Sequence, residues 1–240
     1  MKRHTALLGA VALLLAGSAG LHAATFGPGD HWVDTVTEGT YTAGIQGNFD
    51  ATILGVGAVS FGASGQMTVW HGDAQDTPDP LDPAHLNQVD VEIVSMTLTG
   101  NAPGVGPVTL TAGDGVANGL NDGPLFSGGT VIEAPGDPAL ADSFFDIFFQ
   151  VAIPAYPLTI FNKLPLQVSA QIDRIPPVGF AYVSVGPVNL YDAQNPDGPA
   201  MAQMTGATYT PEPSSLAVVG IGTVVLLVRR RRKHLRPPKP

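Results

Sequence analysis

The chain of 240 residues contains no cysteine. Disulfide bonds, thiolate metal sites and cysteine nucleophiles are therefore excluded, and stability has to come from packing or bound ions. Basic residues are also scarce between residues 25 and 213, where Lys163 and Arg174 are the only two against all 20 acidic residues, a formal charge of −18. The electrostatic field of so negative a segment repels nucleic acid. It attracts cations or cationic partners, or the charge simply keeps the protein soluble.

Long apolar runs are missing from the middle of the chain and occur only near its ends. Lys2 and Arg3 precede a leucine- and alanine-rich run over residues 6–17. This pattern is typical of a secretory signal peptide, and small residues before Thr25 predict a signal covering residues 1–24. A retained membrane anchor or a buried helix is the alternative.

The second apolar run, Leu216–Val228, lies near the C-terminus. As a helix it would be ~20 Å long, against ~30 Å for the hydrocarbon core of a bilayer, so it is short for a lasting transmembrane helix. The apolar run is followed directly by four arginines, Arg229, Arg230, Arg231 and Arg232. If the run crossed the membrane, these positive charges would stay on the cytoplasmic side. The body would then lie outside, unless the run is a buried helix with a basic tail that binds nucleic acid.

The order of the motifs in the C-terminal tail resembles that of a known family. Pro211, Glu212 and Pro213 come first, the apolar run second and the arginine cluster last, which closely resembles the PEP-CTERM sorting signal. The resemblance covers residues 210–240. It implies a bacterial exported protein whose tripeptide is recognised by a membrane-embedded exosortase, which removes the tail on the outer side of the inner membrane. The prolines keep the tripeptide extended, because they restrict the backbone and lack the N–H donor.

Residues 25–209 form the predicted secreted domain, and three segments predict its strands best. Residues 164–173 alternate apolar and polar side chains apart from Pro165. In residues 145–153 every odd position is a large apolar residue, and Pro154 would end that strand. Residues 88–99 also alternate, but their apolar set slips by one residue after Ile93. We expect a β-bulge, or a strand that changes sheets, at that point.

The remaining strand and turn signals are weaker, and no window has a helical apolar repeat. Further candidate strands are residues 40–46, 49–54, 66–71, 107–111, 130–133 and 180–191, the last broken at Gly186-Pro187. Turns are expected at Gly47-Asn48, Asp114-Gly115, Asn121-Asp122-Gly123 and Asp197-Gly198. The prediction is an all-β domain, an antiparallel sandwich or jelly roll of roughly 8–10 strands, with a barrel as the alternative.

Four aspartates at intervals of three form the most suggestive polar pattern, namely Asp73, Asp76, Asp79 and Asp82. Hard oxygen ligands crowded into a loop suit calcium. The spacing departs from the EF-hand, however, and a solvated loop rich in turns, continuing through residues 77–87, is the alternative. Calcium is the one cofactor that the sequence suggests.

No catalytic constellation is evident, so we expect a protein that is not an enzyme. The histidines of the body, His31, His71 and His85, are scattered, and residues 62–65 do not form a nucleophile elbow. Several aromatic residues could stack on sugar rings or simply pack in the core: Trp32, Trp70, Tyr41, Tyr156, Tyr182 and Tyr191.

These observations favour an exported protein of the cell envelope or extracellular matrix with a non-catalytic structural or adhesive domain. A carbohydrate- or calcium-binding module is the alternative, and a secreted hydrolase ranks third. The expected partners are an exosortase, the membrane through the C-terminal helix, and extracellular polysaccharide. Nucleic acid is not among them.

Overall fold

The computed structural model describes residues 31–76, 86–113, 126–135, 137 and 139–213. The predicted signal peptide, the apolar run 216–228 and Arg229–Arg232 lie outside them. Within these ranges no helix is long and apolar enough to cross a membrane. The elements are η1 (Trp32–Thr35), β1 (Gly39–Ile53), β2 (Gly57–His71), β3 (Gln75–Asp76), β4 (Asn87–Ala102), β5 (Gly106–Gly113), β6 (Ser127–Glu133), β7 (Ala141–Ile147), β8 (Phe149–Ile153), β9 (Leu158–Asn162), β10 (Leu166–Ile172), β11 (Tyr182–Ser184), β12 (Val188–Asp192) and β13 (Ala202–Glu212).

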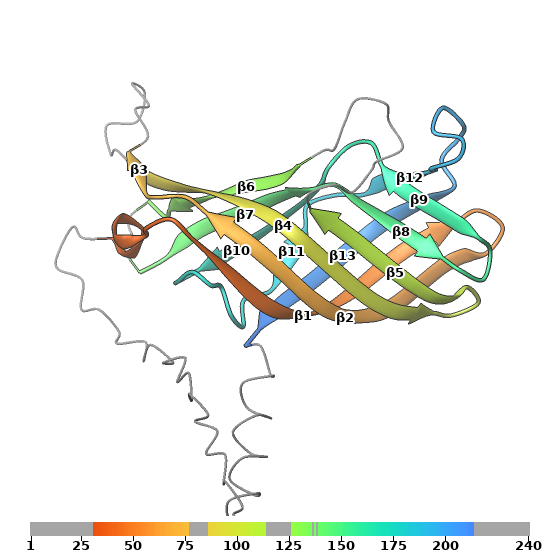
Figure 1. Ribbon diagram of the computed structural model, residues 1–240, viewed down its shortest axis with the longest axis horizontal. Coiled ribbons are helices and arrows are strands. Elements are labelled where there is room, and N and C mark those ends of the chain that lie inside the picture. Colours follow the sequence, from red (N-terminus) through yellow and green to blue (C-terminus); the bar gives the residue numbers. More distant parts are fainter. Residues whose placement is uncertain (1–30, 77–85, 114–125, 136, 138, 214–240) are drawn as a thin grey trace, which may run out of the picture.

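The described strands form one antiparallel sheet that closes on itself (Figure 1). One path runs β1-β2-β4-β5-β8-β9-β12-β13, and β13 pairs again with β1. A second path joins β13 to β4 through β11, β10, β7 and β6. The all-β antiparallel prediction is confirmed. The sandwich or jelly roll is corrected to a closed sheet, because the first and last long strands pair along most of their length.

Strand β4 contains the predicted slip of the apolar pattern. In the pairing with β2, Thr68 lies opposite Ser95 and Val69 opposite Ile93, so Val94 is the extra residue of a bulge. The partner on the other side of β4 changes at the same place, from β6 before the bulge to β5 after it. Of the two expected explanations, the bulge is confirmed, whereas β4 changes its neighbour within a single sheet and does not change sheets.

The predicted single strand 145–153 is divided at Phe148 into β7 and β8. Two polar side chains complete the backbone hydrogen bonds around the break. The Phe148 N–H donates to Ser127 Oγ over 2.9 Å, and Ser127 Oγ donates to the Phe148 carbonyl over 3.1 Å. Asn162 Oδ1 accepts from the Phe149 N–H over 2.7 Å, and its Nδ2 donates to the Ile147 carbonyl over 2.8 Å. The alternation of side chains does not reveal this break, because it continues unchanged through it.

The turn predicted at Gly47-Asn48 is wrong, because β1 passes through it without interruption. Gly47 is buried, and a Cβ there would lie 2.9 Å from the Phe49 ring and 3.2 Å from the Thr208 carbonyl oxygen. This glycine therefore allows close packing within the sheet and does not turn the chain.

Other strand predictions are confirmed by β10, by β5 and β6, and by the division of residues 180–191 into β11 and β12. The turn at Asp197-Gly198 is also present, since the Gly198 N–H donates to the Asn195 carbonyl over 3.0 Å. The turns expected at residues 114–115 and 121–123 lie outside the described residues. The sheet has more strands than the 8–10 expected, partly because β9 and β13 went unrecognised.

The core fills the inside of the closed sheet with the inward-facing side chains of nearly every strand. Its centre holds Phe145, Tyr182 and Tyr209, of which the two tyrosine rings stack with centroids 5.0 Å apart. The Tyr182 and Ser143 hydroxyls share a hydrogen bond of 2.8 Å. Burial raises the pKa of Tyr182 to about 12, so this hydroxyl stays protonated at neutral pH and can keep its hydrogen bond.

Candidate functional site

The tripeptide Pro211-Glu212-Pro213 lies where the last strand of the sheet ends. Strand β13 includes its first two residues, and in the pairing with β1 Pro211 lies opposite Ile45 and Glu212 opposite Gly44. The backbone is extended there, as the two prolines predict. Pro211 is buried, Glu212 is half-buried and Pro213 is exposed.

Two hydrogen bonds hold the first two residues of the tripeptide. The Gly179 N–H donates to the Pro211 carbonyl over 2.8 Å. The Gln46 side chain on β1 donates from Nε2 to Glu212 Oε2 over 3.1 Å. The tripeptide is therefore in part a component of the folded domain, which its position near the end of the sequence did not predict.

A polar groove of about 590 Å³ adjoins Glu212 on the outer face of the sheet. Its lining comes from β1, β2, β4 and β13 and consists of hydroxyl, amide, glycine and alanine positions together with one carboxylate, that of Glu212. The polar side chains of the lining are Gln46, Asn48, Ser64, Thr99, Thr208 and Thr210. Such a surface can exchange hydrogen bonds with a neutral polar ligand, although no aromatic residue lines it.

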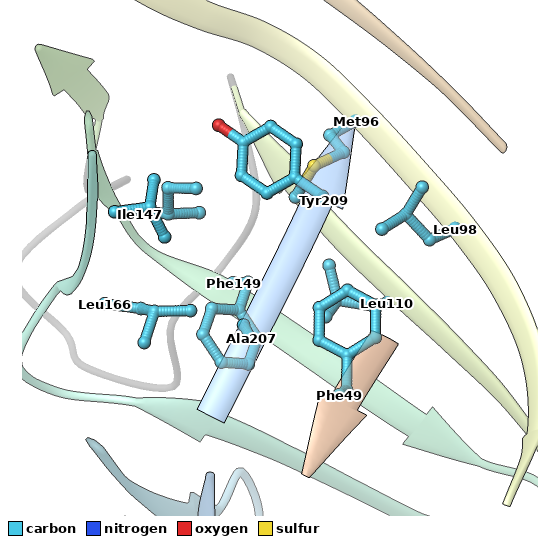
Figure 2. Close-up of a pocket in the computed structure, with 10 residues that line it drawn as sticks. Phe49, Met96, Leu98, Leu110, Ile147, Phe149, Leu166, Ala207 and Tyr209 are labelled. Carbon is cyan, nitrogen blue, oxygen red and sulfur yellow. The ribbon is translucent and has the colours of Figure 1, made fainter. Parts of the chain in front are cut away.

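A second cavity lies in the core and is much smaller. Figure 2 shows apolar side chains, among them Phe49, Leu110 and Phe149, directed at one another around a small gap in the core. The gap has a volume of about 10 Å³, and no polar surface lines it. It is at most as large as one water molecule and lacks the polar partners that a water would need, so it is a packing defect.

An acidic cluster around the buried Glu133 joins the N-terminal turn η1 to β6. Glu133, 3% exposed, accepts a hydrogen bond from the Asn87 N–H over 3.1 Å, and its Oε2 lies 4.0 Å from His31 Nδ1. Asp34 accepts a hydrogen bond from the Asn87 side chain and also contacts Glu133. Burial, together with the Asp34 carboxyl, raises the pKa of Glu133. Residues about a hundred positions apart meet here, and no sequence motif indicates it.

The four aspartates of the suggested calcium site are only partly described. Asp73 Oδ1 accepts a hydrogen bond from the Glu38 N–H over 2.7 Å, and Asp76 belongs to β3, where it pairs with Asn87. Asp79 and Asp82 lie outside the described residues. Across the parts of the chain that are described, no three His, Asp or Glu side chains form a group that could hold a metal ion.

The aromatic residues and histidines divide between core and surface. Trp32 and Tyr182 are buried, Tyr156 is 54% exposed, and Trp70 donates a hydrogen bond to Glu38 over 3.1 Å. The Lys163 ammonium lies 4.4 Å from the centre of the Tyr191 ring, in a cation–π contact. His31 and His71 are partly buried on separate elements, and His85 lies outside the described residues. These side chains do not gather into one sugar-binding surface.

Comparison with known proteins identifies the tail. Residues 210–233 match the family model of the PEP-CTERM protein-sorting motif. The motif implies processing by an exosortase and export with membrane-associated sorting. No curated protein matches the chain.

One solved structure is similar in fold, that of DynF from the dynemicin biosynthesis pathway of Micromonospora chersina. The two chains are 20% identical with a TM-score of 0.61, and the match covers 74% of this chain and 82% of DynF. At this identity the likeness concerns the fold alone.

Proposed function

With the sorting motif as the premise, we propose that the chain is an envelope or matrix protein whose closed β-domain is a non-catalytic structural or adhesive unit. One observation carries the proposal: the motif begins at residue 210, within the last strand of the sheet, which ends at Glu212. Among the described residues, all the other strands precede the motif. Removal of the segment that follows would therefore leave an intact closed sheet.

The charge of the body supports a role outside the cell. Residues 25–213 carry a formal charge of −18, whereas the tail ends in a basic cluster. A membrane segment flanked by positive charge keeps that flank in the cytoplasm. We infer that the apolar run 216–228 anchors the chain only transiently, with the body outside, and that residues 1–24 are removed as the signal peptide.

The intact mass of the protein recovered from its native surface tests this proposal. We expect a chain that lacks the signal peptide and the segment after the tripeptide, together with the mass of any attached group. A full-length chain with both ends uncut, dissolved in the cytosol, would contradict it.

A second candidate function is the binding of extracellular polysaccharide in the outer polar groove. The groove volume of about 590 Å³ and its hydroxyl and amide lining favour a neutral, hydroxylated ligand. Calorimetry with neutral bacterial polysaccharides tests this function. The heat of binding is compared between Asn48→Ala, which changes the groove, and Asn189→Ala, a matched control on the exposed face of β12. The function would be supported if the unmodified protein binds the polysaccharide and only Asn48→Ala reduces the heat of binding.

Calcium binding is tested by the same method, because Asp73 and Asp76 belong to the suggested set of four ligands. If the four aspartates bind one calcium ion together, we expect titration with calcium to give a saturable heat of binding. Asp73→Asn should reduce this heat. A secreted hydrolase remains the least supported reading. A screen on glycans and esters, with turnover abolished by one carboxylate substitution, would be needed to establish it.

A further inference from the structure

We propose that strand β1 and the exosortase compete for the same tripeptide, so that Pro211 and Glu212 are recognised only after they leave the sheet. This inference rests on the proposed processing of the tail. It adds that the folded domain itself controls access to the processing signal.

The backbone of the tripeptide is the first part of this argument. Pro211 and Glu212 lie opposite Ile45 and Gly44 in the β1–β13 ladder, and the Pro211 carbonyl accepts a hydrogen bond from Gly179. Proteins that bind an extended peptide commonly pair with its backbone edges. In the folded domain, neighbouring segments already occupy those edges.

The side chains are the second part. Pro211 is buried against the domain, and the Glu212 carboxylate accepts a hydrogen bond from Gln46 over 3.1 Å. Pro213 alone among the three residues is exposed. An enzyme that distinguishes this tripeptide from other sequences must contact its side chains. In the folded domain, only the side chain of Pro213 is fully accessible to such an enzyme.

The position of the tripeptide makes its release a local event. β13 ends at Glu212, and Pro213 has no N–H with which to extend the ladder. Gly44, opposite Glu212, contributes no side chain to a cross-strand contact. Strand ends open at much lower free energy than whole domains, so these residues can detach while the rest of the sheet stays closed.

A reversible cross-link tests the proposal. Gln46 and Thr210 are opposite each other on β1 and β13, directly before the tripeptide. The chain has no cysteine, so a disulfide in the double variant Gln46→Cys/Thr210→Cys is the only one that can form. Purified, folded full-length protein is incubated with membranes that contain the exosortase, and cleavage is followed by intact mass with and without dithiothreitol.

We expect the oxidised double variant to be cleaved about tenfold more slowly than its reduced form, since a cross-link beside the strand end suppresses its opening. The matched control is Thr52→Cys/Gln203→Cys, which joins the same two strands at their other end. Its cleavage rate should be the same in both redox states. Thermal unfolding checks that all forms are folded.

A second variant acts in the opposite direction without a cross-link. Gln46→Ala removes the hydrogen bond to Glu212, and we expect cleavage about threefold faster, which corresponds to ~0.6 kcal/mol of pairing free energy. Gln203→Ala, which removes the bond to Asn189 at the far end of β13, should leave the rate unchanged.

The outcomes separate this inference from the proposed function. Equal cleavage of the oxidised and reduced Gln46→Cys/Thr210→Cys protein would show that the paired tripeptide is itself a substrate, and would overturn the inference. An unmodified chain that the exosortase never cleaves would instead overturn the proposed function, and the inference with it.

Discussion

At the scale of single residues, a few buried polar side chains do what the backbone alone cannot. Asn162 is fully buried and bridges the break between β7 and β8, with further support from a hydrogen bond of 2.8 Å to the Leu164 carbonyl. Ser127 satisfies both backbone groups of Phe148 at the same break. Because of these two side chains, the chain can pass from β7 to β8, which pair with different strands, without leaving buried backbone donors or acceptors unpaired.

We expect Asn162→Ala to lower the free energy of unfolding by about 3 kcal/mol, because it leaves several buried backbone groups without a partner. Urea unfolding measures this change. Asn189→Ala, at an exposed position, should change stability by less than about 0.5 kcal/mol. Equal effects of the two substitutions would show that the bridge across the strand break is not important for stability.

The raised pKa of Glu133 predicts a pH dependence with a definite sign. The folded protein holds this proton to higher pH than the unfolded chain, whose glutamate has a pKa of about 4.3. The associated stability is therefore complete below that value and is lost as pH rises through the folded pKa.

Unfolding curves from pH 4 to pH 8 test this dependence. The loss of stability with rising pH should be smaller in Glu133→Gln than in the unmodified chain. Asp197→Asn, in an exposed turn, is the control for removal of one negative charge. If both variants changed the slope equally, the effect would come from net charge and not from the surroundings of the buried Glu133.

At the scale of elements, glycines determine how closely neighbouring strands approach. A Cβ at Gly65 on β2 would lie 1.8 Å from the Thr97 carbonyl oxygen on β4. Only a residue without a side chain permits this contact. Gly65 therefore serves the close approach of two strands and not a turn.

We expect Gly65→Ala to cost about 3 kcal/mol, because β2 and β4 would have to separate. Gly186→Ala is the matched control, since a Cβ there would meet nothing within 4 Å. Thermal unfolding of both variants measures the difference. A Gly65→Ala protein as stable as the unmodified chain would mean that the ladder adjusts without cost.

At the scale of the whole molecule, charge separates the two parts of the chain. The acidic residues lie between residues 30 and 212, and nine of the 11 basic residues lie outside that interval. A positively charged flank favours the cytoplasmic side of a membrane, so this separation supports the proposed topology, in which the anionic domain and the arginine cluster lie on opposite sides.

Replacement of Arg229–Arg232 by glutamine should impair membrane orientation and retention before processing, because a positively charged flank favours the cytoplasmic side of a membrane. Replacement of Lys233 and Arg236 is the control, since it leaves the cluster adjoining the apolar run intact. Protease accessibility in spheroplasts and membrane fractionation measure both variants. Unchanged orientation and processing without Arg229–Arg232 would contradict this account of the tail.

Local patterns predicted part of the fold and failed for identifiable reasons. The slip after Ile93 predicted the β4 bulge, because alternation shows directly where a strand changes the face that it buries. β13 was missed because it contains a similar irregularity: Thr205 is the extra residue opposite Asp50 and Ala51, so its buried positions change parity midway. The acidic cluster around Glu133 was missed because its members are far apart in the sequence.

The β-class of the domain, the charge of the body and the sorting motif of the tail were all predictable from the amino-acid sequence. These properties depend on composition, on an alternation with a period of two, or on short contiguous motifs. The closure of the sheet and the pairing of Pro211 and Glu212 with β1 became evident only in the folded domain. The physical reason is that alternation specifies which face of a strand is buried, whereas the choice of its neighbour depends on contacts between distant segments.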